Sequence, residues 1–583
     1  MTRIIIKFTK ILNKQQKIRV IIIGVMMIIG AFLETLGVGL ILPLVSAITT
    51  PNFITTNKYA IMVCDFFDLH SPRTFMVVVI GALIFIYIFK NLYLLLEYYV
   101  QYRFTCNNRF SVQSRLMEIY LRRPYEYFLD AETGEITRVI TNDTANTFAL
   151  LSTVLSFFTE AVVSVALIVT IIAADPFMAF LLAAVLGSVM FLIGKMIKPV
   201  LRKAGVSFQK NIGQMNKWLF QSISGIKEIK VTQKEEYFLE QFSKYGKKAI
   251  DSEKLNSILG TVPRLAIEAI GISSMLGVIA LLMFKGREVD TMLPQLSAFA
   301  MAAVRLMPSV NRMSASLNSM SYQEPALDKM LEHLAVAEKW KSQQKASDVA
   351  SSRMAGKITL DQSAELSDIT YSYPNTATPV LLHANMEIPV GKSIGVVGAS
   401  GSGKTTAVDI LLGLLELQDG SVLSDGANIQ ADYKGWLGHI GYIPQMIYML
   451  DDTIRANVAF GVPEKAIDED QVWRALEEAQ LKDFVQSLPN GLDTTIGERG
   501  VRLSGGQRQR IGIARALYPD PELLIFDEAT SALDNETEAA IMESINALHG
   551  RKTMVIIAHR LTTIKECDMV YRVEDGKIIR EES

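Results

Sequence analysis

Residues Gly398 to Thr406 read Gly-Ala-Ser-Gly-Ser-Gly-Lys-Thr-Thr. They follow the apolar run Ser393–Val397 and precede the helix-like run Ala407–Leu415. A strand, a glycine loop and the start of a helix, in that order, direct backbone N–H groups and the helix N-terminus at phosphate oxygens. The sequence therefore predicts a nucleotide site here.

Two side chains of this loop have expected roles of their own. Lys404 neutralises the β- and γ-phosphate charges, and Thr405 offers its hydroxyl to Mg²⁺. The residues of this stretch that we expect to bind the nucleotide are Gly398, Ser400, Gly401, Ser402, Gly403, Lys404, Thr405 and Thr406.

The bulk composition indicates two unlike regions. A chain of 583 residues exceeds one hydrophobic core, and 50% hydrophobic residues is high for a soluble protein with 20% charged residues. The net charge of −2 gives no support for a nucleic-acid partner. Cys64, Cys106 and Cys567 lack metal-ligand spacing and are expected to be plain thiols.

The N-terminal part, residues 1–332, is predicted to be a membrane domain with six spans. Each segment is long and apolar enough to cross a bilayer at about 1.5 Å per residue. The expected spans cover 20–48, 75–99, 147–174, 177–197, 258–284 and 292–313.

Lys and Arg gather in the connections between spans two and three and between spans four and five. Because cytoplasmic loops retain these residues, both termini are expected to be cytoplasmic. The same two connections are long and helical in pattern, so the spans are expected to continue beyond the membrane. Within them, Leu129–Thr141 and Gln221–Val231 are predicted contact helices.

Residues 333–356 have a linker composition, and 357–583 form a second domain. Short β-branched runs alternate there with helical patterns, which predicts an α/β nucleotide-binding domain. Its expected strands include Gly438–Ile443, Leu523–Phe526 and Thr553–Ile557. The run Leu523-Leu-Ile-Phe-Asp527 ends in an acid and is followed by Glu528. Behind a phosphate loop, the first acid is expected to hold the Mg²⁺ shell and the second to polarise the attacking water.

Five further stretches resemble the motifs of ATP-binding cassette proteins. Leu503-Ser-Gly-Gly-Gln507 is similar to the family signature, and Tyr442-Ile-Pro-Gln445 to the segment that carries its glutamine. The others are the switch-histidine segment Ile557-Ala-His559, the Ser531-Ala-Leu-Asp534 loop and the aromatic Tyr373. Six spans ahead of one such cassette resemble an exporter half-transporter, which implies a multi-pass α-helical membrane domain fused to an α/β phosphate-loop domain.

The resemblance implies roles for these residues. Glu528, His559 and Gln445 are the implied catalytic groups, and Mg²⁺ would be held by Thr405, Gln445 and Asp527. ATP would also contact Tyr373, Ser504, Gly505, Gly506 and Gln507. Tyr371 is the weaker candidate for stacking on adenine. In the family the signature of one chain closes on the ATP held by another, so a homodimer with two composite sites is implied, and a heterodimer with a degenerate partner remains open.

Arginines in the last two spans suggest the substrate. Arg305 and Arg312 are seven residues apart and share one helix face, and Arg264 lies in the preceding span. Three guanidiniums suit a phosphate or pyrophosphate headgroup. The alternative is that they snorkel to the interface, with Arg264 paired to Glu268 one turn away.

Arg123-Pro-Tyr-Glu-Tyr-Phe-Leu-Asp130 and the segments around these arginines resemble PglK-type lipid-linked oligosaccharide flippases of bacterial inner membranes. This implies ATP-driven flipping of a polyprenyl-pyrophosphate-linked oligosaccharide, an anionic lipid-linked glycan, within membrane lipid. Export of peptides, drugs or other lipids is the alternative. A nucleotide-gated channel is a further class, disfavoured because Glu528 and His559 are both present.

Overall fold

The computed structural model describes residues 1–39, 61–62, 72–174, 176–284, 306–336, 339, 357–374, 376, 378–528, 541–543, 545–558 and 564–581. The chain divides into two compact units. Unit 1 comprises Met1–Arg123 and Ala131–Lys341, and unit 2 comprises Pro124–Asp130 and Ser342–Ser583. The short segment 124–130 thus belongs with the C-terminal unit, although the sequence places it between two spans.

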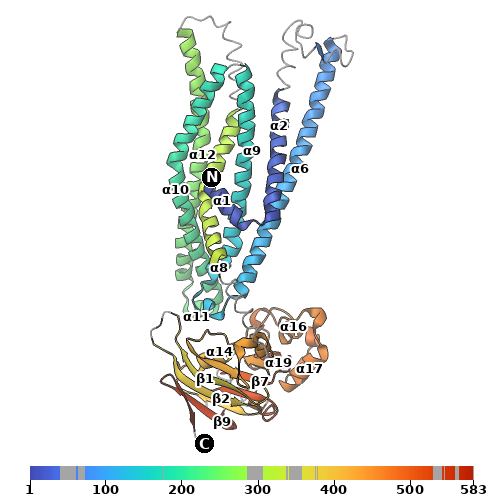
Figure 1. Cartoon of the computed structure of the whole chain (residues 1–583), viewed down its shortest axis with the longest axis vertical. Helices are drawn as coiled ribbons and strands as arrows, with labels where there is room; N and C mark the ends of the chain where they lie inside the picture. The colour runs from blue at the N-terminus through green and yellow to red at the C-terminus, as the bar shows by residue number, and fades with distance from the viewer. Residues whose placement is uncertain are drawn as a thin grey trace. The chain divides into compact units, whose positions relative to one another are not determined.

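The regular elements among the described residues of unit 1 are all helices (Figure 1). A helix also covers residues 306–336. The other elements are α1 (Thr2–Ile11), α2 (Lys14–Gly39), α6 (Pro72–Leu121), α8 (Thr133–Arg138), the π-helical turn Val139–Asp143, α9 (Thr144–Ala174), α10 (Pro176–Ser224), α11 (Ile226–Thr232) and α12 (Glu235–Phe284).

The long helices extend well past the expected spans. Helices α6 and α12 have 50 residues each, or about 75 Å at 1.5 Å per residue, against a hydrocarbon core of about 30 Å. Among the described residues, four helices are long and apolar enough to cross a membrane. The span and domain boundaries themselves stay predictions.

The core of unit 1 joins helices that are far apart in sequence. Ile267 of α12 and Leu306 and Val310 of the 306–336 helix are buried together with Val163 of α9 and Ala31 of α2. Large apolar side chains also point outward, among them Phe85 and Phe180, which are 69% and 75% exposed. An apolar outer surface around an apolar core is typical of a helix bundle solvated by lipid.

Unit 2 contains two sheets. An antiparallel sheet has the order β2-β1-β4-β5, and a largely parallel sheet has the order β10-β9-β3-β8-β7-β6, with β10 antiparallel to β9. The strands are β1 (Ser363–Tyr371), β2 (Leu381–Pro389), β3 (Ser393–Val397), β4 (Asp419–Ser424), β5 (Ala427–Asn428), β6 (Ile440–Ile443), β7 (Leu523–Asp527), β8 (Thr553–Ile557), β9 (Met569–Glu574) and β10 (Lys577–Glu581).

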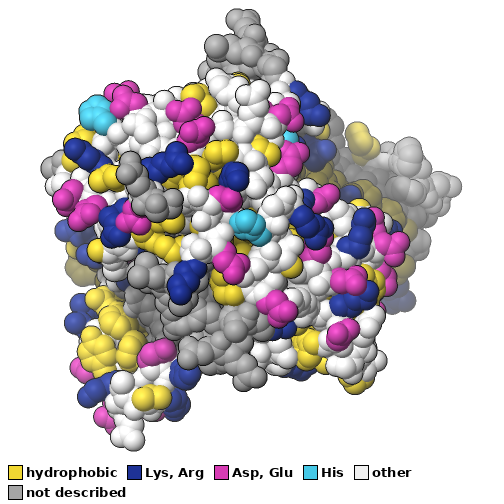
Figure 2. Space-filling model, turned by 90° about the horizontal axis from the view of Figure 1, so that it is seen from below, with side chains coloured by type: hydrophobic (Ala, Val, Ile, Leu, Met, Phe, Trp, Pro, Cys, Tyr) yellow, Lys and Arg dark blue, Asp and Glu magenta, His cyan; other side chains and the backbone are white. Residues whose placement is uncertain are grey.

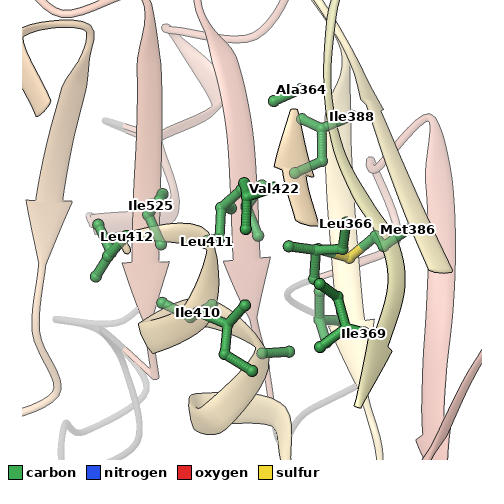
Figure 3. Close-up of a cluster of buried hydrophobic side chains, with 14 of the residues drawn as sticks. Ala364, Leu366, Ile369, Met386, Ile388, Ile410, Leu411, Leu412, Val422 and Ile525 are labelled. Carbon is green, nitrogen blue, oxygen red and sulfur yellow. The ribbon is translucent and has the colours of Figure 1, made fainter. Parts of the chain in front are cut away.

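Helix α14 (Lys404–Leu411) lies between the two sheets and fills the first core of the unit. Figure 3 shows Ile410 and Leu411 between Ile525 of β7 and the strands that carry Leu366 and Val422. Because α14 begins directly after the glycine loop, this packing fixes the direction in which its N-terminus points.

A second core is formed by helices against the other side of β6, β7 and β8. They are α16 (Ile454–Val458), α17 (Glu469–Glu478), α18 (Lys482–Ser487) and α19 (Gly505–Leu517); α15 (Tyr433–Gly438) precedes β6. Arg515 of α19 donates from Nε to Asn457 O (2.8 Å) and from Nη1 to Tyr448 O (2.8 Å). It therefore ties α19 to the segment that follows β6.

The first predicted contact helix, Leu129–Thr141, is not one continuous helix. Its range holds the end of one helix, all of α8 and the first part of the π-helical turn, with a break at residues 131–132. The helix before this break, α7 (Tyr125–Asp130), begins at Tyr125. Pro124 explains the start, since proline suits the beginning of a helix. The second predicted segment, Gln221–Val231, contains the end of α10 and most of α11, separated by a turn at Gly225.

The face shown in Figure 2 carries acidic and basic side chains interspersed with apolar ones. Among its described residues, neither sign gathers into a continuous stripe. The described part of this face therefore presents both signs of charge.

Candidate nucleotide site

The loop after β3 requires glycine at its first position. Gly398 has φ +152°, and a Cβ there would lie 2.5 Å from Val573 O and 2.7 Å from Ser402 Oγ. Gly403, which caps α14, has φ +106°. Any L side chain at these positions would be strained, so the glycines allow the turn that leads into α14.

Lys404 is the first residue of α14, and only 5% of it is exposed. Its Nζ donates to Gly398 O (3.0 Å) and to Ala399 O (2.9 Å), so the ammonium is curled into the loop. Ser402 Oγ is buried and has no hydrogen-bond partner within the described part of the chain. A buried cation, an unpartnered hydroxyl and a helix N-terminus fit phosphate oxygens.

The two acids end the buried strand β7. Asp527 is 6% exposed, and Tyr442 OH lies 3.4 Å from its Oδ2. Glu528 has φ +50°, and its backbone N–H donates to Ile557 O on β8 (3.2 Å). A left-handed conformation is unfavourable for a glutamate. This backbone conformation ends the extended course of β7 after Asp527 and turns the chain at Glu528.

Negative charge is concentrated behind the loop. Burial, reinforced by the charge of Glu528, raises the pKa of Asp527 above its usual value, although Tyr442 and Lys404 act in the opposite direction. Burial and then the charge of Asp527 raise the pKa of Asp409, on α14, to about 6. Burial and the same carboxylate raise the pKa of Tyr442.

This crowding of carboxylates fits a bound cation. Thr405, Gln445 and Asp527 offer a hydroxyl, an amide oxygen and a carboxylate, which are the hard oxygen ligands that Mg²⁺ prefers. A divalent ion would also relieve the repulsion between Asp527 and its acidic neighbours. Asp409 was not among the predicted site residues, because nothing in its local sequence indicates that α14 brings it near β7.

Gln445 and Glu528 are in direct contact. Gln445 Nε2 donates to Glu528 Oε2 at 2.6 Å, although the two residues are 83 apart in sequence. The contact links the segment after β6 to the acid after β7. It turns the amide nitrogen of Gln445 toward the carboxylate, so that the amide oxygen remains as a possible metal ligand.

The two tyrosines near the loop have different surroundings. Tyr371 is fully buried, and its hydroxyl donates to Glu126 Oε1 on α7 (3.0 Å). Tyr373 is half-buried, its ring meets that of Tyr371 edge-on, and its hydroxyl lies 3.0 Å from Thr406 Oγ1. A ring beside the loop and not enclosed in the core is the better surface for a base, which favours Tyr373 over Tyr371.

Glu126 also accepts a hydrogen bond from the backbone N–H of Glu416 (2.9 Å). A single carboxylate thus holds α7 to both β1 and the segment that follows α14. The sequence contained no signal for this contact beyond the position of α7 itself.

The signature segment forms the start of a helix. Ser504 caps α19 in a capping box: its Oγ accepts from Gln507 N (3.2 Å), and Gln507 Oε1 accepts from Ser504 N (2.8 Å). Ser504 and Gly505 are exposed, whereas Gly506 is buried. The N-terminus of α19 is therefore rigid and accessible, as a second phosphate-facing surface requires.

Of the predicted site residues and motifs, three lie outside the described residues: the switch histidine His559, the Ser531–Asp534 loop and Arg305. Of the other arginines, Arg264 on α12 is exposed and forms no ion pair with the described residues. Arg312 forms a two-pronged contact with Glu160 of α9, from Nε to Oε1 (2.5 Å) and from Nη2 to Oε2 (3.0 Å).

Glu160 was not among the predicted site residues, and Glu268 was expected to be the nearby acid. Glu268 is exposed on α12 and forms no ion pair with Arg264. Glu160 is an isolated acid in the apolar helix α9, which was a signal for an internal partner.

Comparisons with known proteins show what this chain is similar to. Residues 381–531 match the family described as ABC transporter, and residues 20–300 match the ABC transporter transmembrane region. An ATP-dependent lipid A-core flippase of Desulfotalea psychrophila is 32% identical over 388 residues, or 66% of this chain and 65% of that protein. One of Methylobacillus flagellatus is 30% identical over 482 residues, or 81% of this chain and 78% of that protein.

Among solved structures, a bacterial Atm1-family ABC exporter with ATP bound has a similar fold. Its TM-score is 0.74 at 21% identity, and the match covers 97% of this chain and 95% of that one. At this identity the likeness concerns the fold alone.

Proposed function

Because this chain belongs to the ABC transporter family and joins its transmembrane region to its ATP-hydrolysing domain, we propose that it is an ATP-driven exporter that flips an anionic lipid-linked substrate across a bacterial inner membrane. Both termini would face the cytoplasm.

For hydrolysis, Lys404 and the loop amides bind the phosphates of ATP, and Tyr373 stacks on the base. Thr405, Gln445 and Asp527 would hold Mg²⁺, which when bound supplies positive charge to the transferring phosphoryl group. Glu528 acts as the base that orients and polarises water, because its carboxylate adjoins Asp527 and already accepts a hydrogen bond from Gln445. His559 completes this set as the switch residue.

For assembly, we propose a homodimer with two composite ATP sites. Ser504, Gly505, Gly506 and Gln507 open a capped and accessible helix N-terminus. Such a terminus binds an anion through its N–H groups and the helix dipole. In the homodimer, the second chain supplies the nucleotide that this helix N-terminus binds. Each chain can do so because it has both Lys404, which binds the phosphates, and Glu528, which supports hydrolysis.

For the substrate, we propose a polyprenyl-pyrophosphate-linked oligosaccharide. The relatives named lipid A-core flippases support a lipid with anionic groups over peptides or cationic drugs. The exposed Arg264 is the guanidinium with which the headgroup would pair, since Arg312 is engaged by Glu160. Arg305 would belong to the same site. A lipid A-type glycolipid is the alternative within this class.

The observation that supports an active ATPase most directly is the 2.6 Å contact between Gln445 and Glu528 beside the buried Asp527. To test the transport proposal, the purified protein is reconstituted into liposomes with a panel of a polyprenyl-pyrophosphate sugar, a lipid A glycolipid, a short peptide and a cationic drug. We expect the first to stimulate ATP hydrolysis most and to be flipped in an ATP-dependent manner.

The variant Arg264→Ala should reduce flipping about tenfold or more, because a charge-assisted contact is lost. Arg264→Lys should recover part of it, since charge is kept without the planar fork. Lys247→Ala, an exposed cation on the same helix, is the matched control. Flipping of the lipid A glycolipid alone would select the alternative substrate, and stimulation by the peptide or drug alone would refute the anionic-lipid proposal.

A further inference from the structure

Cavities of about 430, 620 and 1010 Å³ lie within the described part of unit 1, and the one of about 620 Å³ has an unusual lining. It lies between α1, α10 and the 306–336 helix, which Figure 1 shows in the same part of unit 1. Its polar lining includes Arg3, Lys7, Lys195, Lys198 and Arg202, against the single acid Glu324. We call it the α1–α10 pocket.

The charges of this pocket do not balance. Lys7 Nζ contacts Glu324 Oε1 (2.9 Å) and Asp328 Oδ1 (2.5 Å), and Arg202 lies 3.9 and 3.6 Å from the same two acids. Two cations are thereby matched by two acids. Arg3, Lys195 and Lys198 are exposed and form no ion pair within the part of the chain that the structure describes. Three positive charges remain around one cavity.

The same pocket continues into an apolar groove along α10. Gly187, Phe191, Gly194 and Lys198 follow at spacings of four, three and four residues, so they share one helix face. A Cβ at Gly187 or at Gly194 would meet nothing within 4 Å, and Phe191 is 70% exposed. The glycines thus leave open space beside an aromatic side chain.

The length and direction of the groove match one leaflet of a bilayer. Eleven residues separate Gly187 from Lys198, or roughly 16 Å of helix at 1.5 Å per residue, and half a hydrocarbon core is about 15 Å. Lys198 directly follows the expected fourth span, at its cytoplasmic end. The basic part of the pocket is therefore at headgroup depth and the glycine groove at acyl-chain depth.

We propose that the α1–α10 pocket binds an anionic glycerophospholipid of the cytoplasmic leaflet. Its phosphate is held by Arg3, Lys195 and Lys198, and one acyl chain lies along Gly187 and Gly194. The lipid joins α1 to α10, whereas the Lys7 ion pairs join α1 to the 306–336 helix. A zwitterionic headgroup fits less well because its own cation enters a site that already has excess positive charge. The site involves none of the arginines proposed for the transported substrate.

The test is native mass spectrometry of the full-length protein in a non-ionic detergent, titrated with phosphatidylglycerol or phosphatidylcholine of the same acyl chains. We expect one phosphatidylglycerol per chain to bind at least about tenfold more tightly than phosphatidylcholine, from charge-assisted contacts. Lys195→Gln with Lys198→Gln should remove most of this preference. Arg103→Gln with Arg109→Gln, a matched loss of two exposed cations on α6, should leave it unchanged.

A second variant tests the groove without changing charge. Gly194→Leu fills the open space and should weaken phosphatidylglycerol binding severalfold, whereas Gly81→Leu, an exposed glycine on α6 whose added Cβ also meets nothing within 4 Å, should not. Basal ATP hydrolysis serves as the check that each variant is folded.

Three results would overturn the proposal. Equal loss of binding in the α10 and α6 charge variants would show diffuse surface attraction. Displacement of the lipid by inorganic phosphate at similar concentration, with Gly194→Leu binding normally, would show a headgroup site without a groove. Displacement by an equimolar polyprenyl-pyrophosphate lipid would show that the pocket loads substrate.

Discussion

Glu528→Gln should separate ATP binding from ATP hydrolysis. Glu528 follows the buried strand β7, is held with φ +50°, and accepts a 2.6 Å hydrogen bond from Gln445 Nε2. A glutamine has nearly the same shape and can still accept this hydrogen bond through its amide oxygen. The substitution therefore removes basicity and charge while the geometry is largely kept.

The expected loss of hydrolysis is large. General-base catalysis typically contributes about a hundred- to ten-thousandfold, so we expect turnover to fall at least about a hundredfold, or about 2.7 kcal/mol of barrier. The affinity for ATP should not fall. The charge of Glu528 is one of the causes that raise the pKa of Asp527. Its removal lowers the negative potential at the site, so ATP should bind at least as tightly as before.

The assay is phosphate release by the full-length protein in lipid nanodiscs, together with ATP binding measured by displacement of a fluorescent nucleotide. Glu416→Gln, which neutralises an exposed acid in the same unit, is the control for charge alone. The variant should also accumulate an ATP-closed dimer, visible by crosslinking across the paired nucleotide-binding units. Turnover within about threefold of the wild type would refute the assignment of Glu528 as base. A parallel loss of ATP binding would refute the separation of the two roles.

Three further predictions concern the same unit. Lys404→Ala should abolish ATP binding, whereas Ser504→Arg should leave binding by each chain intact and prevent closure of the dimer; mixed dimers of the two variants that trap no ATP would contradict head-to-tail sites. Tyr373→Ala should weaken ATP binding about five- to a hundredfold, from the loss of base stacking. Tyr373→Phe, which loses the 3.0 Å contact with Thr406, should weaken it far less, and equal effects would exclude stacking. Burial opposes ionisation of Asp425, but hydrogen bonds from three backbone N–H groups and a hydroxyl outweigh it and lower its pKa to about 2. The stabilisation of the folded state by ionised Asp425 is present above its unfolded pKa near 3.8 and is lost as the pH falls toward 2. Asp425→Asn should therefore lower the thermal midpoint at pH 7 by the equivalent of about 1 kcal/mol, with a smaller difference at pH 3.5, and a pH-independent difference would contradict the mechanism.

The sequence determined those features whose physics is local. A glycine loop between a strand and a helix, an apolar strand that ends in two acids, and apolar segments long enough to cross a bilayer are each encoded within a few tens of neighbouring residues. The expected strands Ser393–Val397 and Thr553–Ile557 coincide with β3 and β8 for this reason. The family membership followed from the same local motifs.

Tertiary structure alone decided which distant groups meet. Tyr442 lies against Asp527 across 85 residues of sequence, and Glu160 engages Arg312 across 152. The isolated acid Glu160 indicates that some partner is needed, but neither contact has a local signature that identifies its partner. The sequence also does not indicate the unbalanced charge around the α1–α10 pocket. Whether a lysine forms an ion pair with an acid of another helix depends on how the two helices pack. The pairing of β6 with β7 brings Tyr442 to Asp527, and the packing of α9 with the 306–336 helix brings Glu160 to Arg312. Contacts of this kind between distant segments set the electrostatics on which the proposed sites depend.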